Sequence, residues 1–498
     1  MRLLRTICVI ALAVSLTAVA YAATQSVKLS GDIEARGFFR DNWAIARATE
    51  ENAAIDRNYQ SWAMTTAEVQ LDADLTDNVA AVIRLVNERD WEVQGTSYSN
   101  QQSLAVNGAG QYAINDDEFD VGVDLAYIEL REFLYSPLTL RIGRQDLWFG
   151  KGFIIGRNQR NPNNISAPEY TAYNSFDAIR ATLDYDPWTI DLVYSKIYNN
   201  AIQASDDCDL LGGNVGYIFD SWNAEAEAYY WYKGMDNKSS LNTQAHNYTH
   251  CIGMRGSFDP IENWTISAEG ASQFGSAILT DMQIEKRNRL AWAVDADIEC
   301  RHFVDKFAWK PVVGAEYIFY SGDTKAAELN DEVARNIEPG GALERNITGT
   351  QAAVPAGTTG DWYHGWDPMF RGKFDTAYRE FIGMYYQTHK YPARPRMFDS
   401  SADASYTNQH QVLFKGSVEP ADDLVCLGKM AMFWLAEPID SQQVDTTYVG
   451  TEFDLQATWD YTEDVSFGLL GAWFIPGYIY DGDHNSVTEL VGSVSVDF

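Results

Sequence analysis

Apolar and polar residues alternate one by one along many short stretches of the chain, a period of two that is typical of β-strands with one apolar face. The last stretch, 490–498, is the clearest case: its even positions are apolar or glycine and end on Phe498, while its odd positions are mostly polar. Stretches 27–40, 222–232 and 290–299 repeat the alternation. The pattern predicts a protein built from strands that are apolar on one face and polar on the other.

Two kinds of polar connection separate these stretches, and they alternate along the chain. The short ones are 76–78, 135–137, 184–187, 220–221, 259–263, 304–306, 419–423 and 462–464. The long ones are 40–61, 88–120, 147–175, 196–209, 233–249, 275–288, 322–407, 436–447 and 475–488. Eight short turns and nine long loops join eighteen strands and leave both termini at the short-turn end. Short periplasmic turns and long extracellular loops are typical of bacterial barrels, so we predict an all-β, transmembrane antiparallel β-barrel of about eighteen strands.

The N-terminus indicates export from the cytoplasm. Basic residues precede an apolar run over 7–19, and Ala20-Tyr21-Ala22 offers small residues for cleavage, so residues 1–22 are predicted to be a signal peptide. Residues 23–498 would then be one barrel domain, with 322–407 as its longest extracellular loop. A closed barrel is the way in which strands satisfy their backbone polar groups in lipid, whereas a large soluble β-domain is the alternative.

A barrel in the bacterial outer membrane is expected to have an aromatic girdle and specific partners. Four tryptophans that follow short turns are expected to form an aromatic girdle at the inner interface: Trp188, Trp222, Trp264 and Trp309. The expected partners are outer-membrane lipid, lipopolysaccharide and the barrel assembly machinery, which would read the strand ending at Phe498. Divalent cations are a further candidate partner at acidic outer loops such as 116–118, 206–209 and 481–483.

Charge and cysteine usage exclude several classes of function. The chain has 70 acidic against 37 basic residues and a net charge of −33, which excludes nucleic acid as a partner. No Cys-x-x-Cys spacing, metal-ligand motif or phosphate-binding loop occurs, so no metal and no cofactor are predicted. Cys208 and Cys251 remain candidates for a disulfide. No nucleophile motif of a hydrolase occurs, and the protein is not expected to be an enzyme.

Residues 140–156 read Leu-Arg-Ile-Gly-Arg-Gln-Asp-Leu-Trp-Phe-Gly-Lys-Gly-Phe-Ile-Ile-Gly, and 174–180 read Asn-Ser-Phe-Asp-Ala-Ile-Arg. Together with Trp-Asp-Pro-Met-Phe at 366–370 and Gly-Thr-Glu-Phe-Asp at 450–454, they resemble the alginate export family of outer-membrane porins (AlgE-like). The residues that carry the resemblance are Gly143, Arg144, Gln145, Phe176, Asp177, Arg180, Gly450, Glu452 and Asp454. The resemblance implies an eighteen-stranded channel for small hydrophilic or charged solutes or for an oligo- or polysaccharide.

Strand parity assigns charged residues to the lumen and groups them by sign. A basic wall is predicted from strands three to six: Arg84, Arg131, Arg141, Arg144 and Arg180. An acidic wall is predicted from strands nine to thirteen: Glu225, Glu227, Glu269, Asp295, Asp297, Glu299 and Glu316. Such walls would face each other and create a transverse field in a narrow pore. Since alginate is a polyanion and the inward acids outnumber the inward bases, the transported solute is left open.

Two other functions are compatible with a barrel. The barrel could be a scaffold or sheath around a partner protein, which would require a wide lumen without an inserted constriction. It could instead be an outer-membrane hydrolase, which would require Ser, His and an acid or amide on adjacent outward faces.

Overall fold

The computed structural model describes residues 26–42, 59–91, 121–158, 167–198, 208–220, 222–238, 244–278, 286–322, 362–383, 407–437, 447–477 and 485–498. The predicted signal peptide and the acidic loop stretches 116–118 and 481–483 lie outside these residues, and of 206–209 only 208–209 are described. No helix among the described residues is long and apolar enough to cross a membrane.

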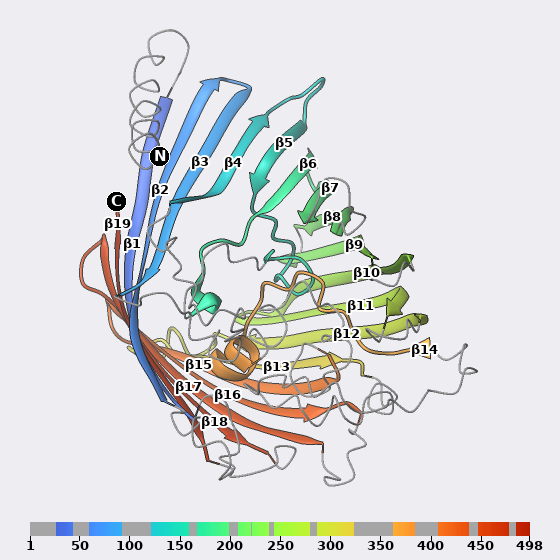
Figure 1. The fold of residues 1–498 in the computed structure, drawn as a ribbon. Helices are drawn as coiled ribbons and strands as arrows, with labels where there is room; N and C mark the ends of the chain where they lie inside the picture. The colour runs from blue at the N-terminus through green and yellow to red at the C-terminus, as the bar shows by residue number, and fades with distance from the viewer. Residues whose placement is uncertain are drawn as a thin grey trace, which may run out of the picture.

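Eighteen antiparallel strands close into a barrel, as the alternation of turns and loops predicted (Figure 1). The strands are β1 (Ser26–Asp41), β2 (Tyr59–Thr76), β3 (Val79–Asp90), β4 (Gly122–Leu130), β5 (Leu138–Gln145), β6 (Phe176–Tyr185), β7 (Trp188–Tyr198), β8 (Cys208–Phe219), β9 (Ala224–Lys238), β10 (Gln244–Ile261), β11 (Trp264–Ile278), β12 (Lys286–Cys300), β13 (Val312–Tyr320), β15 (Gln409–Ala421), β16 (Leu424–Leu435), β17 (Tyr448–Asp460), β18 (Val465–Pro476) and β19 (Val487–Asp497). A further short strand, β14 (Trp362–Tyr363), pairs in parallel with β12 and is not part of the wall.

The barrel closes between its first and last strands. β1 pairs with β19 in a register that sets Phe39 opposite Leu490, and both side chains are exposed on the outer face. Phe498 continues the pairing, because its N–H and C=O both bond to Gly31 at 2.9 Å. The predicted final strand therefore seals the barrel.

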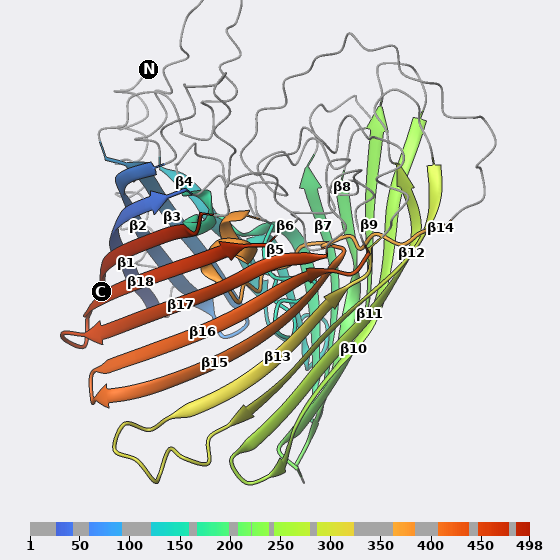
Figure 2. The ribbon, with the colours of Figure 1, turned by 90° about the horizontal axis from the view of Figure 1, so that it is seen from below.

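The short and long connections lie where the sequence places them, with one correction. Figure 2 shows the short connections β12–β13, β15–β16 and β17–β18 at the same end of the barrel. The expected loops 233–249 and 275–288 are wrong in their bounds, because β9 continues to Lys238, β10 begins at Gln244 and β11 continues to Ile278. The alternation of apolar and polar residues ends before these strands do, so the sequence predicts loops that are too long.

The outer face is apolar and carries the expected aromatic residues at the short-turn end. Trp188, Trp222 and Trp309 are exposed, and Trp264, the first residue of β11, is partly exposed. Indole rings prefer the interface between hydrocarbon and head groups. All four lie in or beside short turns, where the sequence predicts the inner girdle.

Two segments fold into the barrel. The first inward segment comprises residues 147–158 and 167–175, and it includes the 3₁₀ turn η2 (Pro168–Tyr170). The second inward segment comprises 362–383, which is part of the predicted loop 322–407, and it ends in the π-helix η3 (Ala377–Gly383). Figure 1 shows η3 inside the ring of strands. The two inward segments together are called the constriction below.

All four cysteines outside the predicted signal peptide are free thiols. Cys208 on β8 pairs with Met235 of β9, whereas Cys251 on β10 pairs with Trp231 of β9. Strand β9 therefore separates the two sulfurs, and the disulfide suggested by their spacing does not form.

Candidate functional site

The two inward segments are joined to each other by main-chain hydrogen bonds. Phe370 N–H donates to Ile154 C=O at 3.0 Å, and Gly156 N–H donates back to Phe370 C=O at 2.8 Å. Gly372 N–H adds a bond to Gly152 C=O at 2.8 Å. Segments more than two hundred residues apart in the sequence thus form one folded unit inside the barrel.

This contact requires glycine on both sides. A Cβ at Gly156 would lie 2.7 Å from the Cα of Gly372, closer than side-chain atoms approach a backbone. Glycine permits this close passage of two backbones. The crossing explains Gly156, the last glycine of the motif.

Apolar side chains bind the constriction to the wall. Phe149 packs on Trp231 of β9 with ring centroids 4.9 Å apart, and Phe153 stacks on Tyr320 of β13 at 5.7 Å. These rings are buried in one cluster, so the constriction adds a core inside the barrel that a hollow tube would lack.

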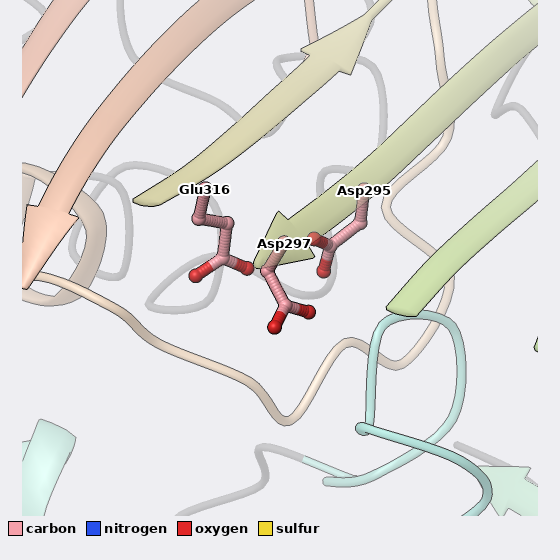
Figure 3. Close-up of side chains that lie close together, drawn as sticks. All are labelled: Asp295, Asp297 and Glu316. Atoms are coloured by element: carbon pink, nitrogen blue, oxygen red, sulfur yellow. The ribbon is translucent and has the colours of Figure 1, made fainter. Parts of the chain in front are cut away.

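Three carboxylates of the predicted acidic wall come together where the constriction meets β12 and β13. Asp295, Asp297 and Glu316 offer oxygens within 4.8 Å of one another and point toward a common centre (Figure 3). Such a set could hold a metal ion by geometry alone. However, Lys151 binds Asp297, and Lys373 binds Glu316 and also Asp295 at 2.7 Å. Lysine ammonium groups thus balance the triad.

Lys373 is the central cation of the constriction. It also lies 3.2 Å from Asp375, and its side chain is 13 % exposed. Burial opposes its charge, but Asp375 and the two wall carboxylates more than compensate, so the pKa of Lys373 lies well above its usual value. Lys151 is affected differently, because burial lowers its pKa against the attraction of Asp295.

A second buried ion pair lies within the second inward segment. Arg371 Nη2 meets Glu380 Oε1 at 2.7 Å, and both side chains are fully buried. Burial raises the pKa of Glu380 to about 7, against the opposing charge of Arg371. This carboxyl is therefore poised to change its protonation near neutral pH.

Asp367 of the Trp-Asp-Pro-Met-Phe motif fixes the segment to β9, β10 and β11. It binds Lys233, accepts a bond from Thr249 Oγ1 at 2.9 Å, and its main-chain N–H donates to Gln273 at 2.8 Å. Burial alone would raise the pKa of Asp367, but Lys233 and Arg289 lower it to about 2. The motif aspartate is therefore an anionic anchor at neutral pH.

Two motif carboxylates of β17 hold the start of η3. Glu452 accepts N–H bonds from Tyr378 at 2.6 Å and Arg379 at 2.8 Å, while Asp454 accepts one from Ala377 at 3.0 Å. The first N–H groups of a helix have no partner within it and favour negative charge nearby. The Gly-Thr-Glu-Phe-Asp motif is thus the receptor for the second inward segment.

Two members of the predicted basic wall, Arg131 and Arg144, do not face the lumen. Arg131 follows the end of β4, lies in the short turn and is 44 % exposed. Arg144 pairs in register with Ala126 and Asp177, which share the outward face with exposed Ile142. Its guanidinium lies 3.7 Å from Asp177 on the outside. Because successive residues of a strand point to opposite faces, Arg144, three positions after inward Arg141, belongs on the outer face.

The remaining arginines face inward, but each has an acidic partner on the same wall. Arg141 of β5 meets Glu129 at 2.7 Å, and Arg180 of β6 meets Asp191 at 2.7 Å. Arg84 of β3 binds Asp124. The charge of these three arginines is therefore balanced locally, and the transverse field between walls of opposite sign stays a prediction.

The acidic wall is only partly balanced. Glu225 and Glu227 of β9 share Arg255, at 2.5 and 2.6 Å, and Glu269 of β11 accepts a bond from Tyr229 at 2.8 Å. At the turn end of β12, Glu299 meets Arg301 at 2.6 Å. The role of both sets in lining a conducting path remains a prediction.

Two other motif residues, Gln145 and Phe176, stabilise the wall where the first inward segment begins and ends. Gln145 Nε2 donates to Ala178 C=O at 2.9 Å, and buried Phe176 packs edge-on against Phe370 at 5.6 Å. Gly450 has a φ of 151° that favours glycine. Sequence reasoning missed the luminal anchors of the constriction: Lys151, Lys233, Asp367, Arg371, Lys373 and Glu380. Of these, Lys151 and Asp367 had a signal, because each lies in a quoted motif.

Comparison with known proteins assigns both family and fold. The profile described as alginate export matches residues 27–492. No curated protein matches the chain significantly in sequence. Among solved structures, OccAB1 of Acinetobacter baumannii is similar with 12% identity, a TM-score of 0.51 and coverage of 96% of this chain and 98% of that one. OccK9 (OpdG) of Pseudomonas aeruginosa (10%, TM-score 0.52, 95% and 99%) and a BenF-like porin from Pseudomonas fluorescens Pf-5 (9%, TM-score 0.51, 95% and 99%) share the fold.

Proposed function

The chain belongs to the alginate export family, and from that premise we propose that its barrel is a narrow, selective channel for small solutes. The broader function is established by the family: the protein is a bacterial outer-membrane channel for small solutes or a polysaccharide. The proposal concerns which solutes pass and what selects them.

One observation carries the proposal: the constriction is fixed to the wall by buried ion pairs on several strands. Lys373 contacts β12 and β13, Asp367 contacts β9, and Glu452 of β17 holds η3. A segment held at so many points narrows the lumen permanently. This arrangement favours small solutes over a thick chain and argues against a sheath around a partner protein.

Charge balance supports a preference for neutral or cationic solutes. Each inward arginine of the predicted basic wall is paired, so no row of free positive charge is left for a polyanion. The chain as a whole is strongly acidic, with a net charge of −33. A negative surround concentrates cations and repels anions.

Planar bilayers with the purified barrel test this proposal. We expect small, stable single-channel steps and a reversal potential on the cation side under a KCl gradient. In liposome swelling, neutral solutes should enter faster than sugar acids of the same size. Anion selectivity, or equal entry of oligomeric and monomeric uronates, would refute the proposal.

Transport rather than catalysis is also part of the proposal. The family assignment supports it, and the hydrolase alternative predicts release of fatty acid from phospholipid vesicles by the purified protein. We expect no release above that of a barrel heated to unfolding. Turnover that depends on the folded barrel would favour the hydrolase.

A further inference from the structure

A polar pocket of about 390 Å³ lies on the outer face of the barrel, where β2 begins and β3 ends. Among the described residues, Thr65 of β2, Asn87 and Arg89 of β3, and Trp91 just after β3 line it. Arg89 pairs with Thr65 in register, and Trp91 Nε1 donates to Thr65 Oγ1 at 2.6 Å. Long loops connect these strand ends to their neighbours, so the pocket lies on the extracellular side.

The alternation of side chains along β3 shows that the pocket faces lipid rather than the lumen. Asn87 and Arg89 share a face with Ile83, whose exposed side chain belongs to the apolar outer wall. Glu88 and Asp90 alternate with them and are buried on the inner face. The described lining therefore combines one cation with hydroxyl, amide and indole groups, and it includes no carboxylate.

The pocket lies at the extracellular edge of the apolar band. On the outer face, alternate residues of β3 are apolar from Val79 to Leu85, and the next two are Asn87 and Arg89. Trp91 is 52 % exposed, and indole rings prefer the interface between hydrocarbon and head groups. The guanidinium of Arg89 is therefore placed at the depth of lipid head groups.

Two other basic side chains at this end of the outer face are held by acids. Arg144 of β5 lies 3.7 Å from Asp177, and Lys196 of β7 meets Asp209 at 3.1 Å. The Arg89 pocket instead offers groups that suit an external anion. A guanidinium matches a phosphate with two parallel hydrogen bonds, and an asparagine amide can donate a further one.

We propose that this pocket binds the phosphate-bearing head group of a lipid in the extracellular leaflet. Lipid covers this face, and phosphate is the anion that its head groups present at this depth. Arg89 pairs with the phosphate, the Asn87 amide donates to it, and Trp91 packs beside the first carbons of the acyl chains. The site does not depend on which solute the lumen admits, so it goes beyond the proposed function.

The test is titration of the detergent-solubilised full barrel with lipid A, read by native mass spectrometry as the number of lipids bound. The probes are lipid A with its phosphates, lipid A stripped of them by a phosphatase, and inorganic phosphate. We expect one lipid A to bind more tightly than any others, and the stripped form to bind there at least tenfold more weakly. Arg89→Gln should weaken this site about tenfold to hundredfold, the loss expected for hydrogen bonds to a charged group. Arg89→Lys, which keeps the charge without the planar fork, should fall between Arg89→Gln and the wild type.

The matched control is Lys196→Gln, which removes one positive charge from the same end of the outer face. It should leave lipid A binding unchanged, and heat-modifiable mobility on gels confirms that each variant is folded. Equal binding of the stripped lipid, unchanged binding in Arg89→Gln, or an equal loss in Lys196→Gln would overturn the proposal. Displacement of lipid A by inorganic phosphate at equal concentration would assign the pocket to a free anion and overturn it as well.

Discussion

Replacing Lys373 by Met should release the second inward segment from the wall. The ammonium group meets Asp295, Glu316 and Asp375, and only 13 % of the side chain is exposed. Removing one partner from a buried ion pair costs about 3–5 kcal/mol, because the remaining charges are left uncompensated. The low exposure means that solvent screening reduces this figure little.

That loss acts on the docking of the segment rather than on the closed barrel. A cost of about 3–5 kcal/mol lowers the docking equilibrium constant about 10²- to 10⁴-fold. The main-chain bonds at Gly152 and the Asp367 anchor still oppose release. We therefore expect larger and noisier single-channel currents in Lys373→Met, in planar bilayers at low salt.

Two variants make the result specific. Lys196→Met removes a lysine that meets Asp209 at 3.1 Å on the outer face, and it should leave the current unchanged. Adding Asp295→Asn and Glu316→Gln to Lys373→Met removes the excess negative charge and should partly restore the quiet state. Heat-modifiable mobility on gels confirms that each barrel is folded. Wild-type conductance and noise in folded Lys373→Met would refute the idea that this ion-pair cluster holds the constriction.

Three other outcomes follow from the same geometry. The pKa of the Glu380 carboxyl is raised from 4.5 to about 7, so its charged pair with Arg371 weakens as pH falls through 7. Because the folded protein holds the proton more tightly than the unfolded chain, the contribution of Glu380 to folding stability decreases as pH rises from 4.5 to 7. Current noise should change between pH 8 and 6 in the wild type but not in Glu380→Gln. Deleting Phe498 removes both main-chain bonds to Gly31 and should lower the amount of heat-modifiable barrel in outer-membrane fractions; normal amounts would show that the last residue is dispensable. Replacing Arg141 and Arg180 together by Ser leaves their acidic partners unpaired and should shift the reversal potential toward cations, less so at 1 M salt, where the Debye length is about 3 Å; no shift at low salt would remove them from the conducting path.

The strands could be predicted because a barrel wall obeys a local rule. A lipid-facing side chain must be apolar whatever lies beside it, so alternation in 222–232 or 490–498 reveals strand and face together. The rule fails at strand ends, where water faces both sides. Arg131 illustrates this: it follows the end of β4 at Leu130, lies in the short turn and is 44 % exposed.

The interior could not be predicted because its partners are set by contacts distant in the sequence. Nothing around Lys373 indicates that it meets Asp295 and Glu316, which lie on two different wall strands. The alternation of faces identified these acids as inward-facing but gave no sign that their charges are paired. Since the inward segments supply the opposing lysines, a tally of strand residues alone misjudges the field inside the pore.

The meeting of Gly156 and Gly372 also constrains the order of folding. The first glycine lies between β5 and β6 and the second lies between β13 and β15, so their contact closes a very long stretch of chain. Closing a longer stretch costs more conformational entropy, and such contacts tend to form late. The seam between β1 and β19 closes a longer stretch still, so by the same reasoning the two inward segments should meet before the wall is sealed. A sealed barrel that lacks its constriction, and would leak larger molecules, should then not form.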